Sequence, residues 1–179
     1  KKIFEQNLNV NFGYKDFEKI NDITNKQKGK SILIRKHLQA IREKDSIILT
    51  TPKKINNEEI KIKLGEKKRF NNYTIKIEKA DLNENFSKNK NTELISFDDL
   101  EENFLIRYWK DGDKFKPLGL NHYKKVSDFL TDLKIPSNQK RKIPVLINRN
   151  KIVWVIGLRI SDEVKITKNT KRAIKLCLN

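Results

Sequence analysis

Paired carboxylates come first among the residues that could perform chemistry, because two nearby acidic side chains can bind a cation or exchange protons. Asp111 and Asp113 flank a glycine. Asp128 and Asp132 are four residues apart, which would place them on one face of a helix. An Asp-Gly sequence is, however, typical of a turn, and lysines surround it here. The helical pair is typical of a solvated face or of a tether for basic side chains, so neither pair predicts a cation site or a catalytic site.

The other sequence patterns that could indicate catalysis are incomplete. The run Gly29–Ser31 imitates the end of a phosphate-binding P-loop, but threonine stands five residues earlier where that motif requires glycine. His37 and His122 have no partner at metal-ligand spacing, and His122 lies in a basic loop where a phosphate or stacking contact competes with simple solvation. Cys177 is the only cysteine, which excludes an internal disulfide and a multi-cysteine zinc site. We therefore expect neither catalytic residues nor a metal site in this chain.

Basic side chains offer a different kind of chemistry, the binding of phosphate. Lys124 and Lys125 precede the segment Val126–Leu133, whose apolar residues recur at helical spacing. The unpaired amides at a helix start carry partial positive charge, so cations there cost about 0.3–1 kcal/mol each. A phosphate would attract both the amides and the ammonium groups. The alternative is that both lysines extend into water.

Two further groups of cations have two competing interpretations each. The run Lys140–Lys142 is either a solvated charge run or a contact to RNA. Arg107 and Arg159 are embedded in predicted strands, where a guanidinium can hold phosphate with two bonds. The alternative for these arginines is a salt bridge that shapes the loop, to Asp113 or Asp128.

The elements that position these residues follow from hydrophobic periodicity. In the first half, Tyr14–Lys26 has apolar residues at helical spacing and predicts a helix. Strands are predicted at four β-rich runs: Ser31–Arg35, Ser46–Thr51, Glu59–Leu64 and Tyr73–Glu78. The polar run Phe86–Thr92 predicts a linker or exposed loop, and we place the main domain boundary near it.

The second half is predicted to form a compact mixed sheet packed by one main helix, Val126–Leu133. Its predicted strands are Phe104–Trp109, Val145–Asn148, Ile152–Leu158 and Ala173–Leu178. Trp109 and Trp154 are expected mainly in the core, with base stacking as a minor alternative. The predicted fold class is therefore α+β. The predicted division is 1–30 as the end of a helical linker region, 31–96 as a β-rich unit and 97–179 as a second domain.

The charge of the chain indicates an anionic partner. Lys and Arg number 40 against 23 Asp and Glu, which gives a net charge of +17. The first 100 residues contain 22 basic and 15 acidic side chains and the last 79 contain 18 and 8, so the excess is denser in the second half. Such an excess favours RNA, DNA, an anionic membrane or an acidic protein. A general bias towards surface lysine competes as the explanation of scattered residues such as Lys61, Lys63 and Lys76.

Several features of the sequence predict where the protein works and what it was part of. The chain contains neither a signal peptide nor an apolar run of membrane-spanning length, so we expect no membrane partner. A single cysteine fits a reducing cytoplasm. The absence of methionine, including at position 1, predicts that the chain is a fragment of a longer one.

A series of residues in the second half occurs in the order and at the spacing of a known family. The series is Arg107, Gly112-Asp113, Pro117-Leu118-Gly119, Lys124-Lys125, Ser127-Asp128-Phe129-Leu130, Pro136, Arg141, Pro144-Val145-Leu146, Trp154-Val155 and Gly157-Leu158-Arg159-Ile160. It resembles the C-terminal domain of bacterial tRNA(Ile)-lysidine synthetase over about residues 97–179. Residues 12–96 resemble, more loosely, the region that joins that enzyme's helical middle to its C-terminal domain.

The resemblance implies a noncatalytic role within an enzyme. That family uses ATP and magnesium to adenylate the wobble cytidine of an isoleucine tRNA, and lysine then displaces AMP. Its N-terminal catalytic domain carries a Ser-Gly-Gly-x-Asp-Ser pyrophosphatase loop, to which nothing in this chain corresponds. The implied partners are therefore isoleucine tRNA, gripped by its body or acceptor arm, and the catalytic domain that this chain lacks.

The RNA-binding candidates are nine basic residues. Five match the family series: Arg107, Lys124, Lys125, Arg141 and Arg159. Four are added from charge clustering: Lys114, Lys116, Lys140 and Lys142. An A-form stem hides its base edges, so we expect contacts to shape, phosphates and 2′-hydroxyls. The alternatives are a protein-interaction or dimerisation module with a generic basic surface, and a free-standing enzyme of another type.

Overall fold

The computed structural model of this chain describes residues 11–52, 58–82 and 91–179. The chain divides into two compact units. One takes in Lys1–Ile55 and Pro136–Gln139, and the other takes in Asn56–Ile135 and Lys140–Asn179.

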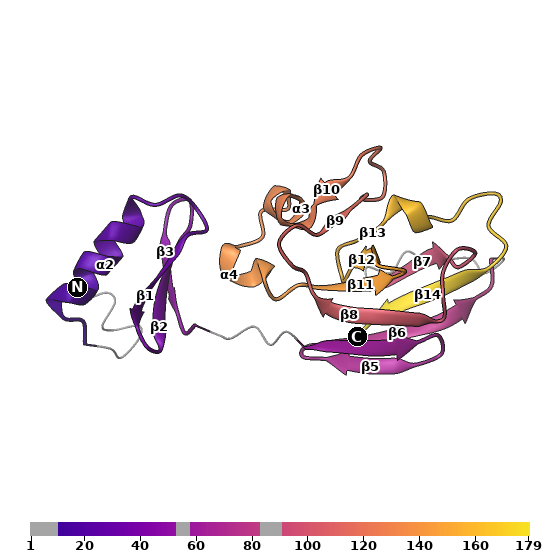
Figure 1. The fold of residues 1–179 in the computed structure, drawn as a ribbon, viewed down its shortest axis with the longest axis horizontal. Coiled ribbons are helices and arrows are strands. Elements are labelled where there is room, and N and C mark those ends of the chain that lie inside the picture. Colours follow the sequence, from indigo (N-terminus) through magenta and orange to yellow (C-terminus); the bar gives the residue numbers. More distant parts are fainter. Residues whose placement is uncertain (1–10, 53–57, 83–90) are drawn as a thin grey trace. The chain divides into compact units, whose positions relative to one another are not determined.

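The first unit consists of a helix and a three-stranded antiparallel sheet (Figure 1). Its elements are α2 (Tyr14–Thr24), β1 (Ser31–Arg35), β2 (Leu38–Arg42) and β3 (Ile47–Thr50). The strands are hydrogen-bonded in the order β1-β2-β3. Ile20 and Ile23, three residues apart on one face of the helix, lie in one buried cluster with Ile34, Leu38 and Ala40 of the sheet.

An ion pair joins the helix and the sheet of the first unit. The carboxylate of Asp16 in α2 accepts a hydrogen bond from the guanidinium of Arg35 in β1 at 2.5 Å and from the amide of Gly13 at 2.9 Å. These bonds, chiefly the one from Arg35, hold the pKa of Asp16 below its usual value. Arg35 is thus committed to a structural role.

The second unit contains two larger sheets whose strand pairs are all antiparallel in the described residues. The five-stranded sheet has the order β13-β12-β11-β8-β4. Its strands are β4 (Glu59–Lys63), β8 (Asn103–Tyr108), β11 (Pro144–Asn148), β12 (Lys151–Val155) and β13 (Arg159–Ile160). The four-stranded sheet has the order β5-β6-β14-β7. Its strands are β5 (Lys67–Phe70), β6 (Tyr73–Ala80), β7 (Thr92–Ser96) and β14 (Ala173–Leu178).

The five-stranded sheet is the middle layer of the second unit (Figure 1). Every residue of β11 is buried, because alternate side chains of this strand enter two different clusters. Leu146 lies in the cluster between the two sheets, together with Ile77 of β6. Val145 and Ile147 lie in the cluster on the opposite face, together with side chains of α3 (Val126–Asp132). A strand with two buried faces requires a continuous apolar run, which the sequence provides here.

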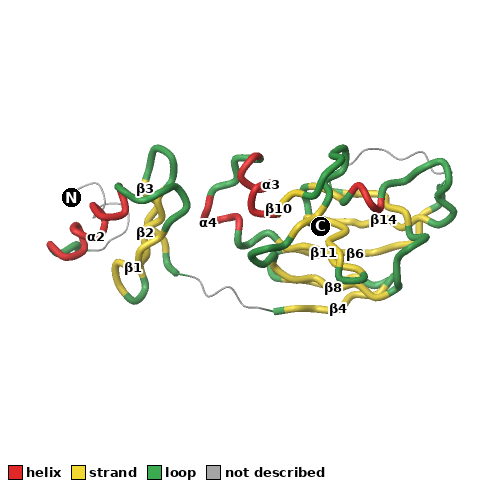
Figure 2. The backbone as a smooth tube through the Cα atoms, turned by 45° about the horizontal axis from the view of Figure 1, so that its top comes forward, coloured by secondary structure: helices red, strands yellow, loops and turns green. Residues whose placement is uncertain are grey.

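A small two-stranded ribbon and two short helical elements complete the second half of the chain. They are β9 (Lys114–Phe115), β10 (Lys124–Lys125), α4 (Ser137–Lys140) and the 3₁₀ turn η1 (Asp162–Val164). β10 leads directly into α3 (Figure 2). Phe115 of β9 packs edge-on against Phe129 of α3 with ring centroids 5.1 Å apart, which attaches the ribbon to the helix.

The α+β class and the main elements agree with the predictions from the sequence. The helix predicted over Tyr14–Lys26 ends at Thr24, and the helix predicted over Val126–Leu133 ends at Asp132. The predicted strands correspond to β1, β3, β4, β6, β8, β11, β12 and β14. Six of the described strands were not predicted, namely β2, β5, β7 and the two-residue strands β9, β10 and β13. The sheet predicted to be mixed is antiparallel throughout the strand pairs described.

The boundary predicted between residues 96 and 97 differs from the observed division. β4 pairs with β8 from Glu59 opposite Arg107 to Lys63 opposite Asn103. β14, the last strand of the chain, inserts between β6 and β7. Residues 58–80 therefore share both sheets with the rest of the second unit, and the division lies near residue 55. Residues 86–90 of the predicted linker lie outside the described part of the chain.

Candidate nucleic-acid interface

Arg107 is held by a carboxylate inside the second unit. From β8, its guanidinium donates to both carboxylate oxygens of Asp113 at 2.7 and 2.9 Å and to the carbonyl oxygen of Tyr108 at 2.9 Å. The side chains of Arg107 and Asp113 are only 13% and 15% exposed. Burial alone would raise the pKa of Asp113, but hydrogen bonds from Arg107 and from the amide of Lys110 outweigh it and lower that pKa. Of the two roles expected for Arg107, the structure shows the salt bridge.

Lys114 and Lys125 have the opposite surroundings. They are cross-strand partners in the β9–β10 ribbon, so their side chains leave the ribbon on the same face. Both are exposed, and no carboxylate of the described ranges lies within ion-pair distance of either. Like charges directly opposite each other are destabilising. An anion bound between these two ammonium groups would remove that repulsion.

Lys124 and Lys125 differ although they are neighbours in β10. Lys124 forms an ion pair with Asp132 of α3, whereas Lys125 is exposed and caps the helix only through its backbone. The helix has seven residues, and the amide of Val126 already donates to the carbonyl oxygen of Asp113 at 2.9 Å. The anion site expected at this helix start therefore has one donor fewer than the sequence implied, and only one of the two lysines lacks a carboxylate partner.

Trp109 organises the basic run that precedes β11. Its indole nitrogen donates to the carbonyl oxygen of Lys140 at 2.7 Å, and the ammonium group of Lys140 donates to a threonine of α3. The guanidinium of Arg141 lies 4.4 Å from the centroid of the Trp109 ring and donates to both carboxylate oxygens of Asp111, at 2.7 and 2.9 Å. Lys142 is exposed, and no described carboxylate pairs with it. Trp109 is thus a core residue, as expected, and it holds part of the cationic run in place.

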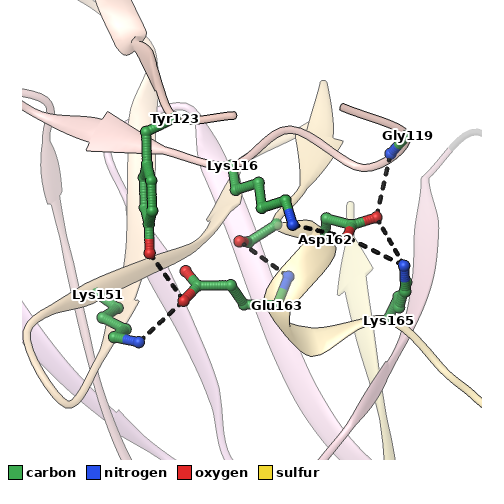
Figure 3. Close-up of polar contacts among 8 residues, drawn as sticks. Lys116, Gly119, Tyr123, Lys151, Asp162, Glu163 and Lys165 are labelled. Carbon is green, nitrogen blue, oxygen red and sulfur yellow. Dashed lines mark hydrogen bonds and ion pairs between the residues drawn. The ribbon is translucent and has the colours of Figure 1, made fainter. Parts of the chain in front are cut away.

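Lys116 belongs to a cluster built around Asp162 in η1 (Figure 3). The Asp162 carboxylate accepts from the amide of Gly119 at 3.2 Å and from the ammonium group of Lys165 at 3.0 Å, and it lies 3.6 Å from that of Lys116. Its side chain is only 10% exposed. The bond from Lys165 is the main cause of its lowered pKa.

Glu163, the next residue of η1, gathers a second set of partners (Figure 3). One of its carboxylate oxygens accepts from the hydroxyl of Tyr123 and from the ammonium group of Lys151, both at 2.9 Å. Burial would raise the pKa of Glu163, but these two bonds outweigh it and lower that pKa. The hydrogen bond to Glu163 correspondingly raises the pKa of Tyr123.

Arg159 is exposed on β13, the edge strand of the five-stranded sheet. Its charge acts on Glu93 of β7, where burial raises the pKa of the carboxyl group and Arg159 partly offsets that rise. Arg159 forms no ion pair within the described residues. It therefore remains an accessible cation at the edge of this sheet.

Most of this unit matches a family defined by sequence. Residues 104–176, from β8 into β14, match a family described as the TilS substrate C-terminal domain. This part of the chain belongs to that family. The resemblance of the second half to the C-terminal region of tRNA(Ile)-lysidine synthetases is therefore confirmed.

Other proteins similar to this chain extend the match in sequence and in structure. The tRNA(Ile)-lysidine synthase of Clostridium perfringens (strain 13) is 30% identical over 192 residues, which cover 98% of this chain and 41% of that protein. The enzyme of that name from Clostridium tetani is 41% identical over 80 residues, covering 45% and 17%. The chain thus spans less than half the length of these relatives. A crystal structure of a TilS C-terminal domain has the same fold, with a TM-score of 0.58 at 18% identity over 68% of this chain and 97% of that one.

Two of the acidic candidates of this unit act as tethers for cations. Asp111 holds Arg141 and Asp132 holds Lys124, while Asp128 accepts a hydrogen bond from the neighbouring Ser127. In the described part of the chain, no group of three or more His, Cys, Asp or Glu side chains could hold a metal ion. No helix in the same ranges is long and apolar enough to cross a membrane.

The sequence analysis missed the two carboxylates of η1 and their partners. The available signal was Ser161-Asp162-Glu163 directly after a strand, because serine followed by acidic residues is typical of a helix start. The side-chain oxygen of Ser161 indeed accepts from the amide of Glu163 at 3.4 Å. Their contacts with Gly119 and Tyr123 span about forty residues of sequence and could not be read from local spacing.

Proposed function

We propose that this chain is the noncatalytic, tRNA-binding C-terminal portion of a tRNA(Ile)-lysidine synthetase. It grips the body and acceptor arm of isoleucine tRNA, while an N-terminal domain outside this sequence attaches lysine to the wobble cytidine using ATP and magnesium. The relatives that it matches are named tRNA(Ile)-lysidine synthase, which supports this assignment. The reaction takes place in the cytoplasm, where tRNA is available.

The observation that carries RNA binding is the opposed pair Lys114 and Lys125. Two lysines directly opposite each other in a ribbon lower the stability of the fold, so the pair requires an explanation. Here two exposed ammonium groups share one face of a ribbon without a carboxylate among the described residues to neutralise them. A backbone phosphate is the ligand that would turn this repulsion into attraction.

The nine candidates contribute in two ways under this proposal. Lys114, Lys125, Lys142 and Arg159 bind phosphates directly, because each is exposed and none has an ion-pair partner among the described residues. Arg107, Lys116, Lys124 and Arg141 are each held by a carboxylate and shape the surface. Lys140 contributes through its hydrogen bond to α3 and the ring of Trp109. Recognition depends on stem shape rather than base edges.

A filter-binding titration across a salt series tests the proposal. The unaltered chain is titrated with isoleucine tRNA and with another tRNA, and so is a variant with K114E and K125E together. We expect the double substitution to weaken binding by about 10-fold or more at low salt and to reduce the salt slope by about 2, one for each lost phosphate contact. K168E together with K171E is the matched control, because both lysines are exposed outside the ribbon and the two substitutions change the net charge by the same amount.

Two outcomes would contradict the proposal. One is an unaltered chain whose tRNA binding does not depend on salt or cannot be detected at low salt. The other is a K114E and K125E variant that loses no more affinity than the control variant with K168E and K171E. A mass that rises with concentration in light scattering, without any tRNA binding, would instead identify a dimerisation module.

A further inference from the structure

The β9–β10 ribbon cannot hold its own shape. Its ladder consists of two residue pairs, Lys114 with Lys125 and Phe115 with Lys124, and residues 116–123 form the loop between them. An isolated two-stranded hairpin is marginally stable at best in water. The position of Lys114 and Lys125 therefore depends on the packing of Phe115 against α3 and also on what fixes this loop.

The beginning of the loop is fixed to the chain around η1. The amide of Asp162 donates to the carbonyl oxygen of Lys116 at 2.7 Å, and the amide of Leu118 donates to that of Ile160 at 3.0 Å. The Asp162 side chain then accepts from the amide of Gly119, which has a φ of 90°, a left-handed conformation that favours glycine. The turn at Gly119 is thus held from one side by a carboxylate.

The end of the loop is fixed by the next carboxylate. Glu163 accepts from the hydroxyl of Tyr123, directly before β10, and Lys151 of β12 holds the same oxygen (Figure 3). The turn that carries both carboxylates is itself anchored. Ser161 is buried, and its amide donates to the carbonyl oxygen of Val153 at 2.9 Å. Two consecutive residues of one rigid turn therefore hold the loop at both of its ends.

We infer that Asp162 and Glu163 are positioning residues that clasp the β9–β10 loop and so hold Lys114 and Lys125 in place for binding RNA phosphates. This inference rests on the proposed function, because it assigns the clasp to the same surface. It goes beyond that function in giving two acidic residues a favourable part in binding a polyanion. The clasp keeps the lysines ordered before RNA binds, so less conformational entropy is lost on binding.

The direction in which RNA affinity changes when a carboxylate is removed separates this inference from a simple effect of net charge. Replacing a carboxylate by a neutral side chain raises the net charge of the domain by one, which by itself strengthens attraction to RNA. Loss of the clasp leaves the loop to be ordered on binding, which weakens affinity. A carboxylate whose removal weakens RNA binding must therefore act by positioning.

The test measures isoleucine tRNA affinity of the 179-residue chain and of matched variants at fixed low salt. We expect D162A and E163A each to weaken binding by about three- to tenfold, since several side chains then become ordered only on binding. E101A is the control, because it removes the same charge, and in the described residues the Glu101 side chain pairs only with exposed Arg149. Its affinity should equal or exceed that of the unaltered chain.

Two conservative variants keep the test valid if an alanine variant is poorly folded. Tyr123→Phe changes no charge and removes only the hydroxyl that Glu163 accepts from, and we expect a loss of about twofold or more. E163Q keeps an oxygen that can accept from Tyr123, so it should recover part of the affinity lost in E163A. Recovery of this kind would not follow from a charge effect, since E163Q and E163A carry the same charge.

Carboxylate variants that bind as tightly as E101A, or more tightly, would overturn the inference. If the unaltered chain shows no salt-dependent tRNA binding, the proposed function fails instead, and hydrogen exchange still decides the clasp. Faster exchange of the Gly119 amide in D162A than in E101A would uphold the clasp. Equal exchange in the two variants would reject it.

Discussion

Two sets of cations in the same domain have opposite surroundings. Arg107 is nearly buried and donates to both oxygens of Asp113. Lys114 directly follows Asp113 and lies opposite Lys125 in the β9–β10 ribbon. Neither lysine has a carboxylate partner in the described ranges. The difference indicates that net charge does not locate an RNA-binding surface, because a cation held by a carboxylate builds the domain whereas an opposed pair of lysines is ready for an anion.

The largest expected effect is the loss of folding stability when the buried Arg107–Asp113 pair is broken. R107A leaves Asp113 as a buried charge without its partner, which should lower the free energy of unfolding by about 3 kcal/mol. Urea denaturation measures this change. R141A is the matched control, because Arg141 and Asp111 are 44% and 78% exposed and such a pair contributes about 0–1 kcal/mol. Equal losses in the two variants would show that the Arg107 pair is not structural.

The pH dependence of stability tests the same ion pair. The pKa of Asp113 is lowered in the folded chain from its ordinary value near 3.8, so its contribution is present above that value and is lost as pH falls through the folded pKa. The difference in unfolding free energy between the unaltered chain and D113N should therefore be constant near neutral pH and should shrink as pH falls below about 4. D111N removes an exposed carboxylate and should differ little from the unaltered chain throughout. If the difference in unfolding free energy between the unaltered chain and D113N grew at low pH, the lowered pKa of Asp113 would be contradicted.

The neighbouring residues Lys124 and Lys125 allow a paired lysine and an unpaired lysine to be compared in tRNA binding. Lys124 is held by Asp132 and Lys125 is not, although both occupy β10. K125Q should weaken tRNA binding by about three- to tenfold and reduce the salt slope by about 1, as expected for a lost phosphate contact. K124Q should stay within about twofold with an unchanged slope, because the charge that it removes is already paired. Equal effects of both substitutions would mean that the ion pair with Asp132 does not distinguish these lysines.

The sequence predicted the local part of this fold well. Apolar periodicity identified α2 and α3, and continuous apolar runs identified β11, β12 and β14. β5 was missed because its residues Lys67, Lys68 and Arg69 are exposed, so the strand has no apolar pattern, which is typical of an edge strand. The domain boundary was misplaced because β4 and β6 find their partners in β8 and β14, pairings that no local pattern specifies.

The sequence proposed basic residues for the candidate site but could not show which of them would be paired with carboxylates. The nine cations are candidates proposed from the sequence, and the salt-bridge alternative for Arg107 named Asp113 correctly. Which lysine of the pair 124–125 would be neutralised depends on the position of Asp132 at the end of α3 and on the rotamer of Lys124. Likewise, Asp162 and Glu163 acquire their roles only when η1 is brought beside the β9–β10 loop.

The smallest expected effect is a change in stability and a change in tRNA affinity that go in opposite directions in one variant, K114E. K114E places a carboxylate directly opposite Lys125, which replaces a repulsive cross-strand pair by an attractive one. The free energy of unfolding should rise by about 0.2–1 kcal/mol while tRNA affinity falls, because the ribbon gains an ion pair and the RNA loses a phosphate contact. Urea denaturation and filter binding of the same preparation measure the two changes. K168E should leave stability unchanged, since Lys168 has no opposed cation in the described sheets. A loss of stability in K114E would mean that the opposed lysines are not strained in the free domain, and that the pair is an ordinary solvated surface.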